Sequence, residues 1–88
     1  MAEKIFKIVS NGGLHARPAT ALVKVASSFE CEVQLEFKGK SVNVKSIMGI
    51  LSLAIPSGAE VKISTKGTDE KMALQTITEA LTKEGIAN

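Results

Sequence analysis

Apolar and polar residues alternate along four short stretches of the chain, and this period of two predicts strands with one buried face. We expect these strands at Glu3–Val9, Cys31–Phe37, Val42–Val44 and Glu60–Thr65. The tripeptide Lys38-Gly39-Lys40 supplies a turn, so that the second and third strands form a hairpin. The first strand stops at Ser10-Asn11-Gly12-Gly13, which predicts a flexible loop.

Three other segments have the pattern of helices. From Ala16 to Phe29 the apolar residues recur at i, i+3, i+4 and i+7, which makes the stripe of an amphipathic helix: Ala19, Leu22, Val23 and Ala26. A short helix is expected from Ser46 to about Leu53, because Pro56 excludes helical geometry from the residue before it. In the last helix, side-chain oxygens of Thr68 and Asp69 are expected to cap the start, and Gly85 is placed to end it.

The order of elements, βαββαβα, predicts an α+β fold. Strands that alternate imply a sheet with one wet face, so the three helices should cover the other face in a two-layer, open-faced sandwich. Two right-handed split βαβ units satisfy the connection rules if the fourth strand lies between the first and second, and the second between the third and fourth. We therefore expect a single domain, residues 1–88, with a four-stranded antiparallel sheet of order 1-4-2-3.

Composition narrows the possible partners. A chain of 88 residues has room for one core and no large active-site cavity. Its 11 basic residues are spread along the chain against nine acidic ones, and aromatic residues number only three, which argues against direct nucleic-acid binding. The formal charge of +2 fits acidic protein partners better. No apolar run reaches the roughly 18 residues of a membrane helix and no leader is visible, so we expect a cytoplasmic protein without membrane insertion. The one cysteine, Cys31, is expected to be a buried apolar side chain.

His15 is the only histidine, and it lies where the glycine loop meets the first helix. The first backbone N–H groups of a helix lack internal partners and carry partial positive charge, so this position is a ready anion site. Arg17, the only arginine, adds a charged fork that suits phosphate oxygens. A lone histidine is more often a surface or capping residue, but here a nucleophile and an anion site coincide.

One question about this segment stays open. Pro18 prefers the first helical position yet disfavours helical geometry at Arg17, so His15 either caps the helix or stands one residue outside it. No carboxylate or metal ligand lies nearby in sequence to support hydrolase or zinc chemistry, and we expect neither metal nor cofactor.

The second helix carries two further candidates. Ser46 is first of all an N-cap, but a phosphate there would add about −2 charge at a favourable helix end without unfolding it. The helix is also apolar nearly all round. Either all of its apolar residues are core, or Ile47, Met48 and Leu51 form an exposed docking patch; we weigh the two equally.

The segment Gly13-Leu14-His15-Ala16-Arg17-Pro18-Ala19 resembles the active-site signature of the HPr family, the histidine phosphocarriers of the bacterial phosphoenolpyruvate-dependent sugar phosphotransferase system. Lys45-Ser46-Ile47-Met48-Gly49 resembles the regulatory serine region of the Gram-positive type. The similarity runs through essentially the whole chain, including the order of elements.

The resemblance implies a carrier rather than a turnover enzyme. Phosphorylated enzyme I would transfer phosphate to Nδ1 of His15, with Arg17 steadying it, and His15 would pass it to enzyme IIA of sugar permeases. An HPr kinase/phosphorylase would modify Ser46, and the product would join a catabolite-control transcription regulator. The partner-binding residues that the resemblance implies are Arg17, Thr20, Lys24, Ile47, Met48 and Leu51. The alternative is a purely regulatory relative that works through Ser46 and would be expected to lack the histidine.

Overall fold

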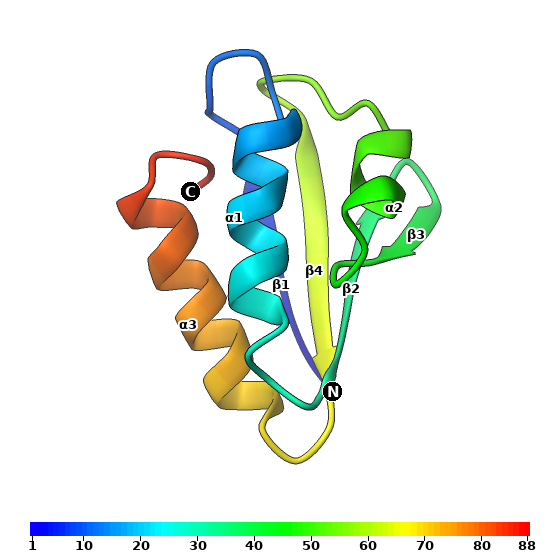
Figure 1. The fold of residues 1–88 in the computed structure, drawn as a ribbon, viewed down its shortest axis with the longest axis vertical. Coiled ribbons are helices and arrows are strands. Elements are labelled where there is room, and N and C mark those ends of the chain that lie inside the picture. Colours follow the sequence, from blue (N-terminus) through cyan, green and yellow to red (C-terminus); the bar gives the residue numbers. More distant parts are fainter.

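The computed structural model describes all residues from Met1 to Asn88 and contains the predicted four strands and three helices in the order βαββαβα (Figure 1). The elements are β1 (Ala2–Lys7), α1 (Ala16–Ala26), β2 (Glu32–Phe37), β3 (Lys40–Asn43), α2 (Ile47–Ser52), β4 (Glu60–Lys66) and α3 (Glu70–Lys83). The boundaries differ from the predicted ones by a few residues. The largest difference is at α1, which ends three residues before Phe29 because Ser28 and Phe29 turn back with hydrogen bonds to Val25 and Ala26.

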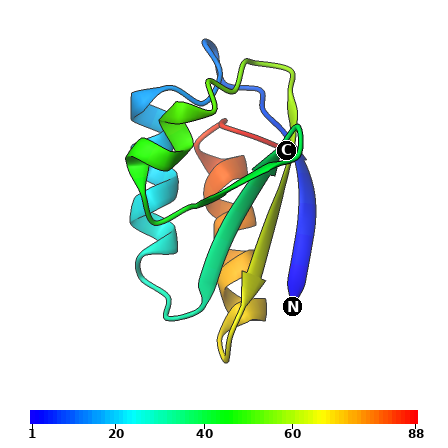
Figure 2. The ribbon, with the colours of Figure 1, turned by 90° about the vertical axis from the view of Figure 1, so that its right-hand side faces the viewer.

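The four strands form one antiparallel sheet of order β1-β4-β2-β3, as the connection rules predicted. The β2–β3 hairpin closes through Lys38 and Gly39, both at positive φ (50° and 79°), which is the backbone of a tight two-residue turn. All three helices cover one face of the sheet and leave the other bare, so the α+β open-faced sandwich is confirmed (Figure 2).

The core lies between the sheet and the helices and contains 19 buried apolar residues. Alternate residues of the strands, such as Phe6, Leu35 and Ile63, meet the inward stripes of the helices, such as Leu22 and Ile77. Cys31 is buried as expected, with 3% of its surface exposed. No helix has the length and apolar character needed to cross a membrane.

The start of α3 differs from the prediction. Neither Thr68 nor Asp69 caps α3 with its side chain; instead the Asp69 carboxylate accepts hydrogen bonds from the backbone N–H groups of Glu30 and Cys31, both at 3.0 Å. These bonds join the turn after α1 to the turn before α3. The N–H of Glu30, above all, lowers the pKa of the Asp69 carboxyl.

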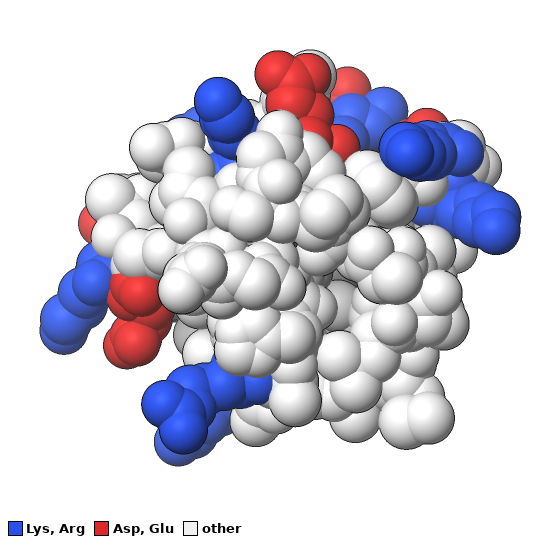
Figure 3. All heavy atoms as spheres, turned by 90° about the horizontal axis from the view of Figure 1, so that it is seen from above, with Lys and Arg blue, Asp and Glu red and all other residues white.

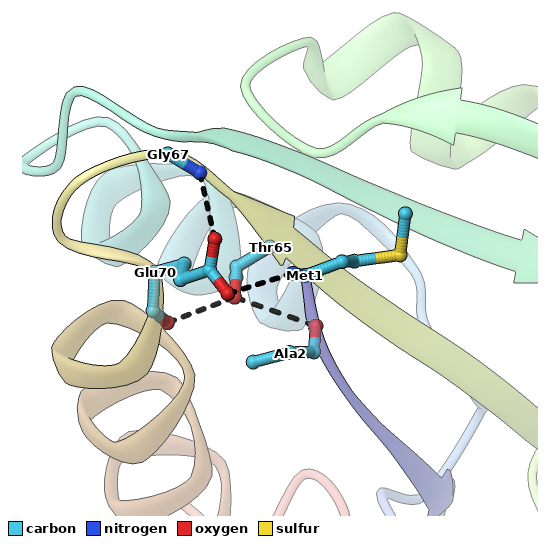
Figure 4. A network of polar contacts seen from close by, with 5 residues as sticks. All are labelled: Met1, Ala2, Thr65, Gly67 and Glu70. Atoms are coloured by element: carbon cyan, nitrogen blue, oxygen red, sulfur yellow. Dashed lines mark hydrogen bonds and ion pairs between the residues drawn. The ribbon is translucent and has the colours of Figure 1, made fainter.

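Glu70 is the first residue of α3, and its carboxylate contacts two groups near this helix start (Figure 4). Its Oε2 lies 2.9 Å from the amino group of Met1, and its Oε1 accepts the N–H of Gly67 at 3.1 Å. The ammonium group of Met1, followed by the N–H of Gly67, lowers the pKa of Glu70. Both carboxylates with lowered pKa therefore lie at the end of the molecule where α3 begins.

Candidate functional site

His15 occupies the N-cap position of α1, which answers the question that the sequence left open. Its backbone is extended (φ −84°, ψ −165°), and its carbonyl oxygen accepts the N–H of Ala19 at 2.9 Å. The imidazole makes no capping hydrogen bond and is exposed. Pro18 is the third residue of the helix rather than the first, and Arg17 is helical although it precedes a proline. His15 thus caps the helix through its backbone alone and leaves its ring free.

Two backbone N–H groups next to this ring have no acceptor. Ala16 and Arg17 are the first helical residues, so no helical carbonyl precedes them, and their N–H groups make no other hydrogen bond. Pro18 has no N–H to contribute. The guanidinium of Arg17 is exposed and forms no ion pair, and the first turn holds no acidic residue. Unpaired donors and a cation therefore directly follow His15 in the chain, at the helix start where an anion on His15 would lie.

The loop before His15 is held by its own hydrogen bonds, which the sequence did not predict. Gly13 is buried at φ +77°; its N–H donates to the carbonyl oxygen of Ser10, and the Ser10 hydroxyl donates to the Gly13 carbonyl oxygen at 2.7 Å. Gly12, at φ +85°, lies against the imidazole: a Cβ there would stand 3.2 Å from Cδ2 and 3.6 Å from Nε2 of His15. The ring therefore rests its Cδ2–Nε2 edge on Gly12. In the sequence, the pair of adjacent glycines is the only signal that could have indicated this contact.

Helices α1 and α2 lie side by side and run in opposite directions (Figures 1 and 2). His15 therefore begins one helix at the end where the other finishes, and Ser46 lies at the far end of α2. Ser46 is the N-cap that the sequence predicted, because its hydroxyl oxygen accepts the N–H of Gly49 at 3.2 Å. The structure thus puts His15 and Ser46 on neighbouring helices but does not bring them together.

Some apolar residues of α2 are buried in the core, and others are exposed. Ile50 is completely buried, whereas Met48 is 73% exposed. Ile47 and Leu51 are half-buried, packing against the core with part of each side chain. One stripe of α2 is core, and Met48 with its two half-buried neighbours forms an apolar surface. An isolated exposed apolar residue is ordinary, but Met48 and its two half-buried neighbours together form an apolar patch on this six-residue helix.

The remaining predicted residues lie on one strip of α1. Arg17, Thr20 and Lys24 are spaced at i, i+3 and i+7, and all three are exposed. The Thr20 hydroxyl donates to the Ala16 carbonyl oxygen at 2.7 Å. We call this strip together with the apolar patch the α1–α2 face; its residues are Arg17, Thr20, Lys24, Ile47, Met48 and Leu51.

The α1–α2 face has two cations and no acidic residue, since neither helix contains Asp or Glu. Figure 3 views the end of the molecule that carries the His15 loop and shows a broad uncharged surface with charged groups around its edge. No group of three or more His, Cys, Asp or Glu side chains lies close enough together to hold a metal ion. The chemistry available at this end is therefore that of one imidazole beside an anion site.

Comparisons with known proteins find matches over nearly the whole chain. Residues 2–83 match the family model described as the phosphotransferase system HPr component phosphorylation site. The fold is similar to a histidine-containing phosphocarrier protein of Mycoplasma, with 35% identity over 97% of both chains and a TM-score of 0.93. It is similar to HPr from Thermoanaerobacter tengcongensis, with 41% identity over 97% of this chain and 94% of that one and a TM-score of 0.90.

A third similar structure is Crh, described as a catabolite-repression protein of Bacillus subtilis, with 42% identity over 89% of this chain and 90% of that one and a TM-score of 0.74. The match to the family model covers nearly the whole chain, and the identities to HPr proteins extend over almost all of it. This chain therefore belongs to the HPr family of phosphocarriers of the phosphotransferase system.

Proposed function

We propose that this chain works in the cytoplasm, where it accepts a phosphoryl group from phosphorylated enzyme I on Nδ1 of His15 and passes it to enzyme IIA of sugar permeases. One observation carries the proposal: the free imidazole of His15 stands at the start of α1 beside two N–H groups that have no acceptor. A phosphate on this ring would gain hydrogen bonds from both and the favourable end of the helix dipole.

The family resemblance implies Nδ1 as the acceptor atom, and the way the ring lies supports it. Its Cδ2–Nε2 edge rests on Gly12, so Nδ1 is on the opposite edge, away from that glycine. In the transfer, the lone pair of Nδ1 attacks phosphorus, an N–P bond forms, and the bond to the donor breaks with its electron pair leaving on the donor. Arg17 is the one side chain of this segment that can add charged hydrogen bonds to the phosphate oxygens. The next transfer, to enzyme IIA, repeats the step in reverse.

The α1–α2 face is the surface that we propose for these partners. Its apolar centre can be desolvated in a complex, and its cations at Arg17 and Lys24 favour acidic partners. Both partners need access to the same ring. The same α1–α2 face can therefore bind the donor and the acceptor in turn, if each partner offers an acidic surface with apolar residues.

We further propose that an HPr kinase/phosphorylase modifies Ser46, and that the product joins a catabolite-control transcription regulator. The Ser46 side chain is exposed and lies at the edge of the same face. A phosphate there would keep an acceptor for the N–H of Gly49, so α2 could stay folded. The similarity to the catabolite-repression protein Crh supports this role.

A second candidate, a regulatory protein that acts only through Ser46, is favoured by that same similarity to Crh. The two proposals differ in what His15 does. A purely regulatory protein has no need of an exposed imidazole at a helix start with unpaired N–H groups, which this chain has.

Incubation with phosphoenolpyruvate and enzyme I tests the proposal directly. We expect one acid-labile phosphate by intact mass, mapped to His15, and its onward transfer to enzyme IIA. His15→Ala should take up none while melting at an unchanged temperature, because His15 is exposed and is not part of the core. Ser46→Ala is the matched control and should be phosphorylated at a rate within a few-fold of the parent. A His15→Ala protein that still gains acid-labile phosphate would refute the assignment, and a parent that gains none would favour the regulatory candidate.

A further inference from the structure

All three methionines of this chain are on its surface. Met1, Met48 and Met72 are 74%, 73% and 65% exposed, and the 19 residues of the core include no methionine. A thioether with this exposure is open to peroxide, which turns a flexible apolar side chain into a polar sulfoxide. The fold therefore does not depend on any sulfur that an oxidant can reach.

The three methionines differ in where they lie. Met48 is the most exposed apolar residue of the α1–α2 face and the second residue of α2. Met72 is on the first turn of α3, and Met1 contacts Glu70 at the same end of the molecule, away from the His15 loop (Figures 1 and 4). Helix α1 lies between α2 and α3, and α2 makes no substantial contact with α3. Only one methionine is thus on the surface that partners would cover.

We propose that Met48 is a redox-sensitive site, and that its oxidation by hydrogen peroxide to the sulfoxide switches off docking at the α1–α2 face. A lone pair of the sulfur attacks one peroxide oxygen, and an S–O bond forms as the O–O bond breaks. The other oxygen leaves with the bonding pair, takes the proton from the transferred oxygen and departs as water. The sulfur gives up two electrons and the peroxide accepts them. Methionine sulfoxide reductases reverse the change.

The physical effect is on desolvation rather than on folding. A sulfoxide is solvated in the free protein and loses that solvation when a partner covers it without offering a hydrogen bond. The fold is spared because Ile50, not Met48, anchors α2 in the core. This inference rests on the proposed use of the α1–α2 face by enzyme I.

The other oxidisable side chain is protected. Cys31 is 3% exposed, and burial, with Asp69 beside it, raises the pKa of its thiol. The protonated, buried thiol reacts slowly with peroxide, since the thiolate is the reactive form. Mild oxidation therefore reaches the methionines first.

The test compares peroxide-treated and untreated protein in phosphoryl transfer from enzyme I at low carrier concentration. Treatment should lower the rate roughly tenfold for the parent and for Met72→Leu. For Met48→Leu, the ratio of treated to untreated rates should stay near one, whatever its starting rate. Met72→Leu is the matched control, because Met72 has a similar exposure and lies off the face. Reductase treatment should restore the parent rate, and the melting temperature should be the same before and after.

Two results would overturn this inference alone: an unchanged rate in the oxidised parent, or an equal fall in Met48→Leu. Failure of the untreated parent to take phosphate on His15 would overturn the proposed function as well. The untreated reaction therefore separates the two failures.

Discussion

The backbone N–H of Leu14 donates to the carbonyl oxygen of Ile55 at 2.9 Å, and this bond ties the loop that carries His15 to the segment after α2. The same segment also pairs with the chain just before the loop, where Ile8 exchanges hydrogen bonds with Gly58 and Ala59. Leu14 is buried beneath these bonds. The position of the imidazole thus depends on the α2–β4 connection as well as on α1.

Replacement of Gly13 by alanine should displace this loop. Gly13 has φ +77°, and its Cβ would stand 2.8 Å from Cα of Pro56 and closer still to the carbonyl oxygen of Ile55. We expect Gly13→Ala to lower the free energy of unfolding by about 2–4 kcal/mol and to slow phosphate uptake. Gly39→Ala is the matched control, because Gly39 has φ +79° and open space around it, and should cost only about 1 kcal/mol. Equal losses in urea denaturation would show that the close approach is unimportant.

The architecture could be predicted because its signals are local or topological. Alternation fixed which face of each strand is buried, as at Val33 and Leu35, and right-handed connections then left the order 1-4-2-3. The partner of Asp69 could not be predicted, because it lies 39 residues away at Glu30 and the local pattern favoured a helix cap. Local rules identify a polar side chain that needs a partner, and only the packed chain decides which one it finds.

The candidate site, like the fold, could be predicted where its signals are local and could not where they depend on tertiary contacts. The cap at Ser46 and the position of His15 near the start of α1 follow from rules about helix starts, but these rules left open whether His15 itself is the cap. The support from Ile55 and the ring contact with Gly12 could not be inferred, because glycine pairs permit many conformations and only tertiary contacts select one. The sequence also could not show which apolar residues of α2 are buried and which are exposed. Exposure of Met48 and burial of Ile50 depend on how α2 packs on the sheet.

Loss of the Thr65 hydroxyl should weaken the fold without touching the site. Thr65 is the one polar residue that is fully buried, and its hydroxyl donates to the carbonyl oxygen of Glu70 at 2.8 Å. We expect Thr65→Val to lower the free energy of unfolding by about 1 kcal/mol and to leave phosphate uptake unchanged. Thr68→Val, at an exposed threonine whose side chain makes no hydrogen bond, should change stability by less than about 0.5 kcal/mol. Thermal melting of both variants checks the difference, and a slower uptake in Thr65→Val would contradict it.

Stability should fall in acid through Asp69 and Glu70. Both carboxyls have a lower pKa in the folded chain than in the unfolded one, so the unfolded chain binds more protons. Their contribution is present above about pH 4 and is lost as the pH falls through the folded pKa values. We expect Asp69→Asn to melt at a lower temperature than the parent at pH 7, and the gap to be smaller at about pH 3, because the Asp69 carboxylate begins to be protonated in acid. Glu79→Gln, at an exposed carboxylate on α3 without a hydrogen bond or ion pair, is the control and should show little gap at either pH. A gap that persists in acid would show that charge is not the cause.

Phosphate on Ser46 should slow transfer to His15 while leaving the fold intact. The two residues begin neighbouring helices at opposite ends, so the phosphate does not reach the imidazole and must act on the partner. Its charge of about −1.5 to −2 would cancel most of the formal +2 of the chain. It would also lie beside the α1–α2 face, whose only charged residues are cations. The helix start and the N–H of Gly49 should favour the phosphate, so we expect stability to stay level or rise by about 0.3–1 kcal/mol.

Ionic strength separates this mechanism from a steric one. Repulsion between the phosphate and an acidic partner acts over a Debye length of about 8 Å at physiological salt, so higher salt should narrow the gap in association rate with enzyme I. Ser46→Asp and Ser41→Asp carry the same added charge, but Ser41 is on β3 and outside the α1–α2 face. Ser46→Asp should therefore slow association more than Ser41→Asp does, and the difference should shrink with salt. A large drop in melting temperature on phosphorylation would mean that the phosphate disrupts α2. A difference in association rate that does not change with salt would mean that the phosphate blocks the partner by its size.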